Sequence, residues 1–134
     1  MKADLIKDEI QEEIVRLYDI DNNTLACLAS ETARLSMSSN ASFLINTKSD
    51  SQITHGIDCI DMISCDHKKM VIITGREVEW IMSKDEWLTV HQLTEAFGYV
   101  SEKRNRFQWL IENIQSGDGK NYSIILSESK DGLW

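Results

Sequence analysis

The segment that decides our predicted fold is SEKRNRFQWLIENI, at Ser101–Ile114. Its apolar side chains recur at the i, i+3, i+4 and i+7 positions that one face of an amphipathic helix occupies. These side chains are Phe107, Leu110, Ile111 and Ile114. Ser101 is a suitable N-cap for such a helix. The spacing therefore predicts a helix with one face on a core and a polar face opposite.

Two capping boxes precede this segment and predict two more helices. Thr74-Gly75-Arg76-Glu77 and Thr89-Val90-His91-Gln92 each place a threonine three residues before a Glu or Gln, so that the two ends of the box can satisfy each other's backbone amides. We expect one helix to begin at each box. The second helix ends at Gly98, because glycine suits the positive φ of a helix C-terminus.

A strand and a turn follow the third predicted helix. Asn121–Ser127 is rich in apolar and β-branched residues, which predicts a strand, and Lys130-Asp131-Gly132 is typical of a turn. Three helices followed by a two-stranded hairpin are the plan of a winged helix-turn-helix.

The same segments resemble known DNA-binding domains. Ile73-Thr74-Gly75-Arg76-Glu77 resembles the Leu-Thr-x-x-Glu that opens the first helix of OmpR/ToxR-type winged-helix domains and of LuxR-type domains. Gln92-Leu93-Thr94-Glu95-Ala96-Phe97-Gly98 is similar to the Leu-x-x-x-Val-Trp-Gly of the OmpR/ToxR positioning helix, with Phe97 in place of Trp. The segment from Glu86 to Phe97 also resembles the small CaiF/GrlA-type activators. The resemblance covers the C-terminal half and implies a bacterial transcriptional regulator that binds double-stranded DNA.

The third helix is then the expected recognition helix. Arginine and asparagine read base edges, and recognition helices use their N-terminal residues. The expected DNA-binding residues are Lys103, Arg104, Asn105, Arg106 and Gln108, together with Lys120 in the wing. A solvated polar face without a ligand is the alternative. Trp109 is a large aromatic residue on that exposed face, where it could pack under the first helices, stack on a ligand or bind a protein partner, and we expect the last of these.

Residues 1–41 are predicted to form a helical hairpin. Lys2–Tyr18 has apolar residues at helical spacing, and Thr24 can cap a second helix that runs to about Ser36. We expect the apolar face of the first helix to form a homodimer. The expected dimer residues are Ile6, Ile10, Ile14 and Leu17. The same face could instead pack within the chain.

Residues 42–134 form the second predicted domain, which is the winged helix-turn-helix with a small antiparallel sheet before it. Ser42–Asn46, Ile57–Ser64 and Met70–Ile73 read as the strands of that sheet. The predicted fold class is therefore α+β.

Composition supports a second function as an alternative. The net charge of −8 at pH 7 disfavours non-specific binding to nucleic acid and favours a basic partner. The alternative is an acidic protein-interaction module, an inhibitor or co-regulator built on a winged-helix scaffold. Three cysteines and the lack of a membrane-length apolar run predict a cytoplasmic protein with no membrane partner.

Metal binding and catalysis find little support in the sequence. His55, Cys59, Cys65 and His67 could ligate zinc, but the usual spacing of paired cysteines is absent. No phosphate-binding glycine loop, nucleophile elbow or metalloprotease motif is present. We therefore predict no metal, no cofactor, no catalytic residue and no enzymatic activity.

Overall fold

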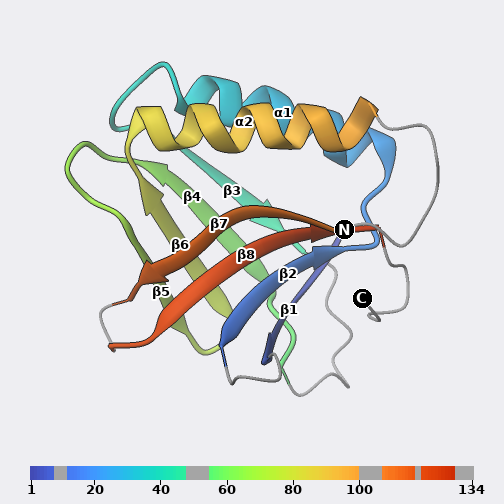
Figure 1. The fold of residues 1–134 in the computed structure, drawn as a ribbon, viewed down its shortest axis with the longest axis vertical. Helices are drawn as coiled ribbons and strands as arrows, with labels where there is room; N and C mark the ends of the chain where they lie inside the picture. The colour runs from blue at the N-terminus through green and yellow to red at the C-terminus, as the bar shows by residue number, and fades with distance from the viewer. Residues whose placement is uncertain (8–11, 48–54, 100–106, 117–118, 129–134) are drawn as a thin grey trace.

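The computed structural model describes residues 1–7, 12–47, 55–99, 107–116 and 119–128, and these residues form two helices and eight strands. In chain order the elements are β1 (Lys2–Lys7), β2 (Glu13–Tyr18), α1 (Asn22–Leu35), β3 (Ser42–Asn46), β4 (Cys59–Ser64), β5 (Met70–Thr74), β6 (Glu77–Met82), α2 (Lys84–Tyr99), β7 (Phe107–Gln115) and β8 (Asn121–Ser127). The strands form two sheets, and α1 and α2 lie side by side above them in the view of Figure 1.

The two sheets are built in the same way from different parts of the chain. Sheet A has the strand order β1-β2-β8-β7, and sheet B has the order β3-β4-β6-β5. In each sheet the two central strands run parallel and the outer strands pair antiparallel to them. The chain is thus two ββαββ units, β1-β2-α1-β3-β4 and β5-β6-α2-β7-β8, that exchange their last two strands.

The two helices show the same repetition in their buried residues. Equal spacing along the chain relates Leu28 to Val90, Thr32 to Thr94 and Leu35 to Phe97, and all six are buried. Each threonine hydroxyl donates to the carbonyl four residues earlier, at 2.7 Å from Thr32 and 2.8 Å from Thr94. The two units therefore repeat the same structural roles, although most of the residues at equivalent positions differ.

One hydrophobic cluster joins both sheets and both helices. Val15, Ile60, Trp80 and Trp87 belong to it, and the rings of Trp80 and Trp87 lie 4.6 Å apart. The indole nitrogen of Trp87 donates to the carbonyl of Ile63 at 3.0 Å, so α2 is bonded to β4 as well as packed on it.

The predicted N-terminal helical hairpin is wrong in its first half. Lys2–Lys7 and Glu13–Tyr18 are the antiparallel strands β1 and β2, in which Ile6 pairs with Ile14. β2 is buried on both faces, so its apolar residues do not alternate with polar ones and the sequence loses the usual sign of a strand.

The first predicted helix of the winged helix-turn-helix is also absent. Thr74-Gly75-Arg76-Glu77 is the tight turn between β5 and β6, with Thr74 paired to Glu77. Gly75 has φ of +62°, which a tight hairpin turn requires and a helix excludes. The threonine and glutamate that suggested a capping box are therefore the last residue of β5 and the first residue of β6, and they pair across the hairpin turn.

The third predicted helix is wrong over its described part, because 107–114 belong to the strand β7, and the winged helix-turn-helix as a whole is contradicted. Register irregularities separate Trp109 from Ile111 and Ile111 from Ile114 in the pairing of β7 with β8. Bulges of this kind shift the alternation of a strand, and Asn113 takes a left-handed φ of 55° within the irregular stretch. The buried residues Leu110 and Ile114 consequently fall at helical spacing in an extended chain.

Several local predictions are confirmed. Ser42–Asn46 is β3, the predicted strands at 57–64 and 70–73 are β4 and β5, and Asn121–Ser127 is β8. The predicted helix after Asn23 is α1, although its N-cap is Asp21, whose carboxylate accepts from the amide of Thr24 at 2.6 Å. The second predicted helix lies within α2, which continues through Gly98 to Tyr99.

The outer face of sheet A contains a buried ion pair. The guanidinium of Arg16 on β2 donates to both carboxylate oxygens of Asp4 on β1, with Nε to Oδ1 at 2.9 Å. Both residues are at most 5% exposed, and Arg16 also lies 4.7 Å from the centre of the Tyr18 ring. This pair fixes β1 against β2, because each charge is costly to bury without the other.

We predict that Arg16→Met lowers the free energy of unfolding by about 3–5 kcal/mol, because Asp4 is then left buried and unpaired. Urea denaturation measures this change. The double variant Asp4→Leu/Arg16→Met, which removes both charges, should recover most of the loss. Lys7→Met removes the ion pair between the exposed Lys7 ammonium and Glu13 at 3.4 Å, while Glu13 keeps Lys120 at 3.7 Å, so this variant should cost under about 1 kcal/mol. Equal losses in the single and double variants would contradict the charge-pair explanation.

Candidate functional site

Of the residues predicted to bind DNA, Gln108 and Lys120 are described, and neither lies on a helix. Lys103, Arg104, Asn105 and Arg106 lie outside the described residues. Gln108 and Trp109 are consecutive residues of β7, so their side chains point to opposite faces of sheet A. Lys120 precedes β8 and its ammonium lies 3.7 Å from the carboxylate of Glu13. Trp109 packs edge-on against Phe107, with ring centres 6.1 Å apart.

The predicted dimer residues lie in the strands of sheet A. Ile14 and Leu17 on β2 are 0% and 3% exposed, and Ile6 on β1 is half-buried beside Ile14. Ile10 lies outside the described residues. Ile14 and Leu17 are therefore buried inside the monomer.

The zinc candidates are separated by the length of a strand. Cys59 begins β4, and Cys65 follows its last residue, which puts roughly 20 Å between them at the usual rise per residue. His55 precedes β4, and His67 lies in the turn after it with φ of 65°. No three possible ligands converge among the described residues.

The feature that the sequence analysis missed is an open face on sheet B. Val78 and Trp80 of β6 point into the core. Because side chains alternate along a strand, Glu77 and Glu79 point to the outer face of sheet B. The strand register places the outward side chains in rows across the sheet. One row is Asn46, Cys59, Glu77 and Thr74, and the next is Leu44, Asp61, Glu79 and Ile72.

Four of these side chains are central, and we call Cys59, Asp61, Glu77 and Glu79 the acidic face. Asp61 on β4 lies directly beside Glu79 on β6, in the parallel pair at the middle of the sheet. Glu77 and Glu79 are exposed, whereas Asp61 and Cys59 are half-buried. Like charges on adjacent strands destabilise a sheet. The fold therefore holds an unfavourable charge arrangement at the centre of an exposed sheet face.

Within the described residues, basic side chains neutralise little of the negative charge of the acidic face. Arg76 pairs with Asp58 at 3.0 Å, at the margin of the acidic face. Among the described residues no basic side chain forms an ion pair with Asp61, Glu77 or Glu79. The thiol of Cys59 responds to the excess charge. Burial raises the pKa of Cys59, and the nearby carboxylates of Glu77, Asp58 and Asp61 raise this pKa further.

A groove lies between α1 and α2. Its volume is about 550 Å³, and small residues of α1 form one wall. The lining residues are Leu25, Ala26, Ala29, Ser30, Ala33, His91, Thr94, Glu95 and Gly98. Gly98 keeps the helices close, because a Cβ at this position would lie 3.3 Å from the Leu25 side chain.

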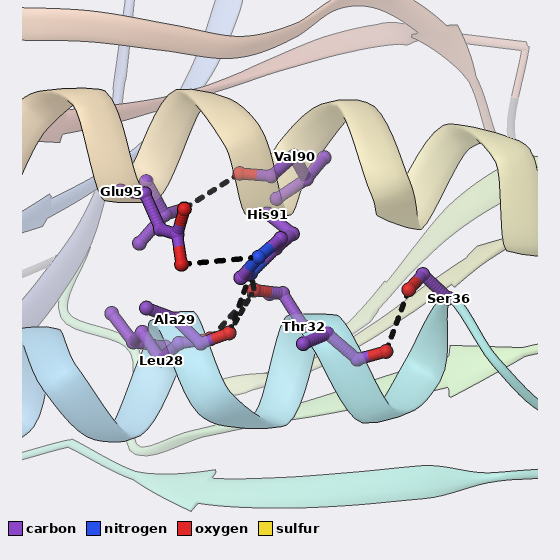
Figure 2. A network of polar contacts seen from close by, with 9 residues as sticks. Leu28, Ala29, Thr32, Ser36, Val90, His91 and Glu95 are labelled. Carbon is purple, nitrogen blue, oxygen red and sulfur yellow. Dashed lines mark hydrogen bonds and ion pairs between the residues drawn. The ribbon is translucent and has the colours of Figure 1, made fainter.

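His91 bridges the two helices inside this groove, as Figure 2 shows. Its Nδ1 donates to the carbonyl of Ala29 on α1 at 2.7 Å, and its Nε2 lies 3.2 Å from the carboxylate of Glu95 one turn along α2. Thr32 lies 3.4 Å from the same Nδ1. The imidazole of His91 thus has a polar partner at each ring nitrogen, and the arrangement serves to hold the helices together.

Comparisons with known proteins found no matching family model, no matching curated protein and no matching solved structure. Among the described residues, neither helix has the length and apolar character needed to cross a membrane. The acidic face is therefore interpreted from its own chemistry. Its sequence signal was the alternation of Glu77-Val78-Glu79-Trp80 and Cys59-Ile60-Asp61-Met62, which is typical of half-exposed strands.

We predict that Glu77→Gln lowers the pKa of Cys59, because Glu77 is the carboxylate whose charge opposes the thiolate most strongly. The pH midpoint of Cys59 alkylation, followed by peptide mass spectrometry, should then move to lower pH. Glu112→Gln on β7 makes the same change of net charge on the other sheet and should leave the midpoint in place. An unmoved midpoint in Glu77→Gln would show that the carboxylate does not act on the thiol.

We predict that His91→Ala lowers the free energy of unfolding by about 0.5–1.5 kcal/mol, because the Ala29 carbonyl loses its donor from α2 and keeps the Thr32 hydroxyl at 3.1 Å. Gln92→Ala, at the neighbouring exposed position of α2, is the matched control and should change stability by under about 0.5 kcal/mol. Thermal and urea unfolding of both variants test this. Equal effects in the two variants would mean that the bridge contributes little.

Proposed function

We propose that this chain is a non-catalytic protein-interaction module whose acidic face binds a basic region of a partner protein, as an inhibitor or co-regulator would. The observation that carries the proposal is the adjacency of Asp61 and Glu79 at the centre of an exposed sheet face. A cationic partner converts this repulsion into attraction, so the free energy stored in the unbound face favours the complex.

The surroundings of the acidic face support a protein partner over a free cation. Leu44 and Ile72 lie at the two ends of the same row as Asp61 and Glu79, and Leu44 is 55% exposed. Apolar side chains beside charged ones are the usual composition of a protein interface. The net charge of −8 acts in the same direction, because it accelerates encounter with a basic protein.

The prediction of DNA binding rested on a recognition helix that the chain does not form, since β7 occupies 107–115. The acidic face would also repel phosphate groups. Binding to double-stranded DNA stays an untested prediction and is a comparison arm of the experiment below.

We predict that the intact chain binds an oligolysine peptide with an affinity that falls as salt concentration rises, since salt screens exposed charges. The variant Asp61→Asn/Glu77→Gln/Glu79→Gln should bind about tenfold more weakly, which corresponds to about 0.5 kcal/mol for each lost charge contact. Isothermal titration calorimetry or fluorescence anisotropy measures both effects.

The matched control removes the same charge from other surfaces. Asp66→Asn/Asp85→Asn/Glu112→Gln neutralises three exposed carboxylates outside the acidic face and should retain most of the affinity. Equal weakening in the two triple variants would show that net charge, and not this face, attracts the peptide. Binding to duplex DNA but not to oligolysine would overturn the proposal.

A further inference from the structure

The two sheets have four edge strands, and three of these edges are occupied or irregular. β1 bonds to the segment before β4, with the Leu5 amide donating to the His55 carbonyl and the Ile57 amide donating to the Ala3 carbonyl, both at 2.9 Å. β7 has an irregular register, and β5 lies against β7. Bulges and covering contacts are common ways of blocking unwanted strand pairing.

Among the described edge strands, β3 is the one that has a regular register and no strand or chain segment paired along its outer side. The strand order ends at β3, so that one side of this strand has no partner strand among the described residues. The carbonyl of Ala41 and the amide of Thr47 point toward β4, where they bond to Ser64 and Asp58. Backbone groups alternate along a strand. The amides and carbonyls of Ser42, Leu44 and Asn46 therefore point away from the sheet.

One contact confirms this direction. The guanidinium of Arg34 on α1 donates to the carbonyl of Ser42 at 2.6 Å, from the side opposite β4. A carbonyl oxygen accepts two hydrogen bonds, so this contact leaves room for a strand amide at the same oxygen.

The sequence of β3 does nothing to discourage pairing. Ser42-Phe43-Leu44-Ile45-Asn46 contains no charge, no proline and no bulge. Leu44 at its centre is 55% exposed. An uncharged regular edge with an exposed apolar side chain is the type that recruits another strand.

We propose that β3 pairs antiparallel with β3 of a second copy of this chain, and that the two copies form a dimer with a continuous eight-stranded sheet. The segment is self-complementary about Leu44. Centred there, the pairing puts Leu44 beside Leu44, Ser42 beside Asn46, and Phe43 beside Ile45 of the second copy. The outer row then holds an apolar pair between two polar pairs, and the inner row holds aromatic–β-branched pairs, which stabilise sheets.

Electrostatics favours this edge contact over any contact between two acidic faces. Asp61 lies one strand from β3, so that in the dimer the two Asp61 residues are three strand spacings apart, about 14 Å. The screening length at physiological salt is about 8 Å. Repulsion across the edge is therefore weak, whereas stacking one acidic face on another would bring like charges together. A strand-edge contact is small, so we expect a concentration-dependent dimer.

Sedimentation equilibrium and light scattering of the intact chain over a range of concentrations test the proposal. We expect a reversible dimer that strengthens as salt rises, because salt screens the remaining repulsion. Leu44→Lys should weaken dimerisation by at least about tenfold, since two ammonium groups would meet at the centre of the contact. Met37→Lys adds the same charge at a residue that is 80% exposed and outside the strands, and it should leave the dimer intact.

Hydrogen exchange of the wild-type chain provides a second measurement that needs no variant. The amides of Leu44 and Asn46 should become protected as concentration rises, because they point along the free edge. A wild-type chain that stays monomeric at all concentrations, or a dimer in which these two amides exchange freely, would overturn the proposal. The opposite salt dependences separate this dimer from oligolysine binding, so that either proposal can fail while the other stands.

Discussion

The parallel pairing of β2 with β8 and of β4 with β6 is the contact on which the rest of the fold depends. Each ββαββ unit alone contains only two hairpins and a helix, and an isolated hairpin is marginal in water. The exchange of strands completes both sheets at once, with 13–17 against 122–126 and 59–64 against 77–82. Neither sheet can form without both halves of the chain, so we expect the two units to fold together.

The same exchange gives the two sheets outer faces of different character. On sheet A, the outer residues Asp4 and Arg16 neutralise each other and are buried. On sheet B, both central parallel strands carry carboxylates on the outer face, with Asp61 on β4 beside Glu79 on β6. Because the core of sheet B is well filled by Trp80, Met62 and their neighbours, the repulsion on its outer face is tolerated. An arrangement that lowers stability without serving the core is the kind of feature that points to binding.

The helix pair shows how a repeated plan accommodates different side chains. Buried threonines occupy equivalent places in α1 and α2 and bond within their own helices. Another pair of equivalent positions differs between the two helices, because α2 has His91 where α1 has Ala29. The small residue leaves its carbonyl accessible, and the imidazole reaches it across the gap. The two helices are thus joined through the His91 imidazole in addition to their apolar contacts.

The sequence by itself determined the elements whose signals are local. The elements α1, the C-terminal part of α2, β3, β4, β5 and β8 follow from apolar runs and turn residues that act within a few neighbours. The acidic composition also pointed to a basic partner, but the acidic face itself could not be foreseen. Asp61 and Glu79 meet only because β4 and β6 pair in parallel across the boundary between the two units.

Tertiary structure alone decided the remaining segments. The spacing of Ile6, Ile10, Ile14 and Leu17 fits a helix, yet burial of β2 on both faces makes a strand the better solution, because a central strand satisfies its backbone through β1 and β8 together. Likewise, the helical spacing in 107–114 is produced by irregular pairing of β7 with β8. Periodicity reports which side chains are buried. Which backbone conformation buries them depends on partner strands that lie far away in the chain.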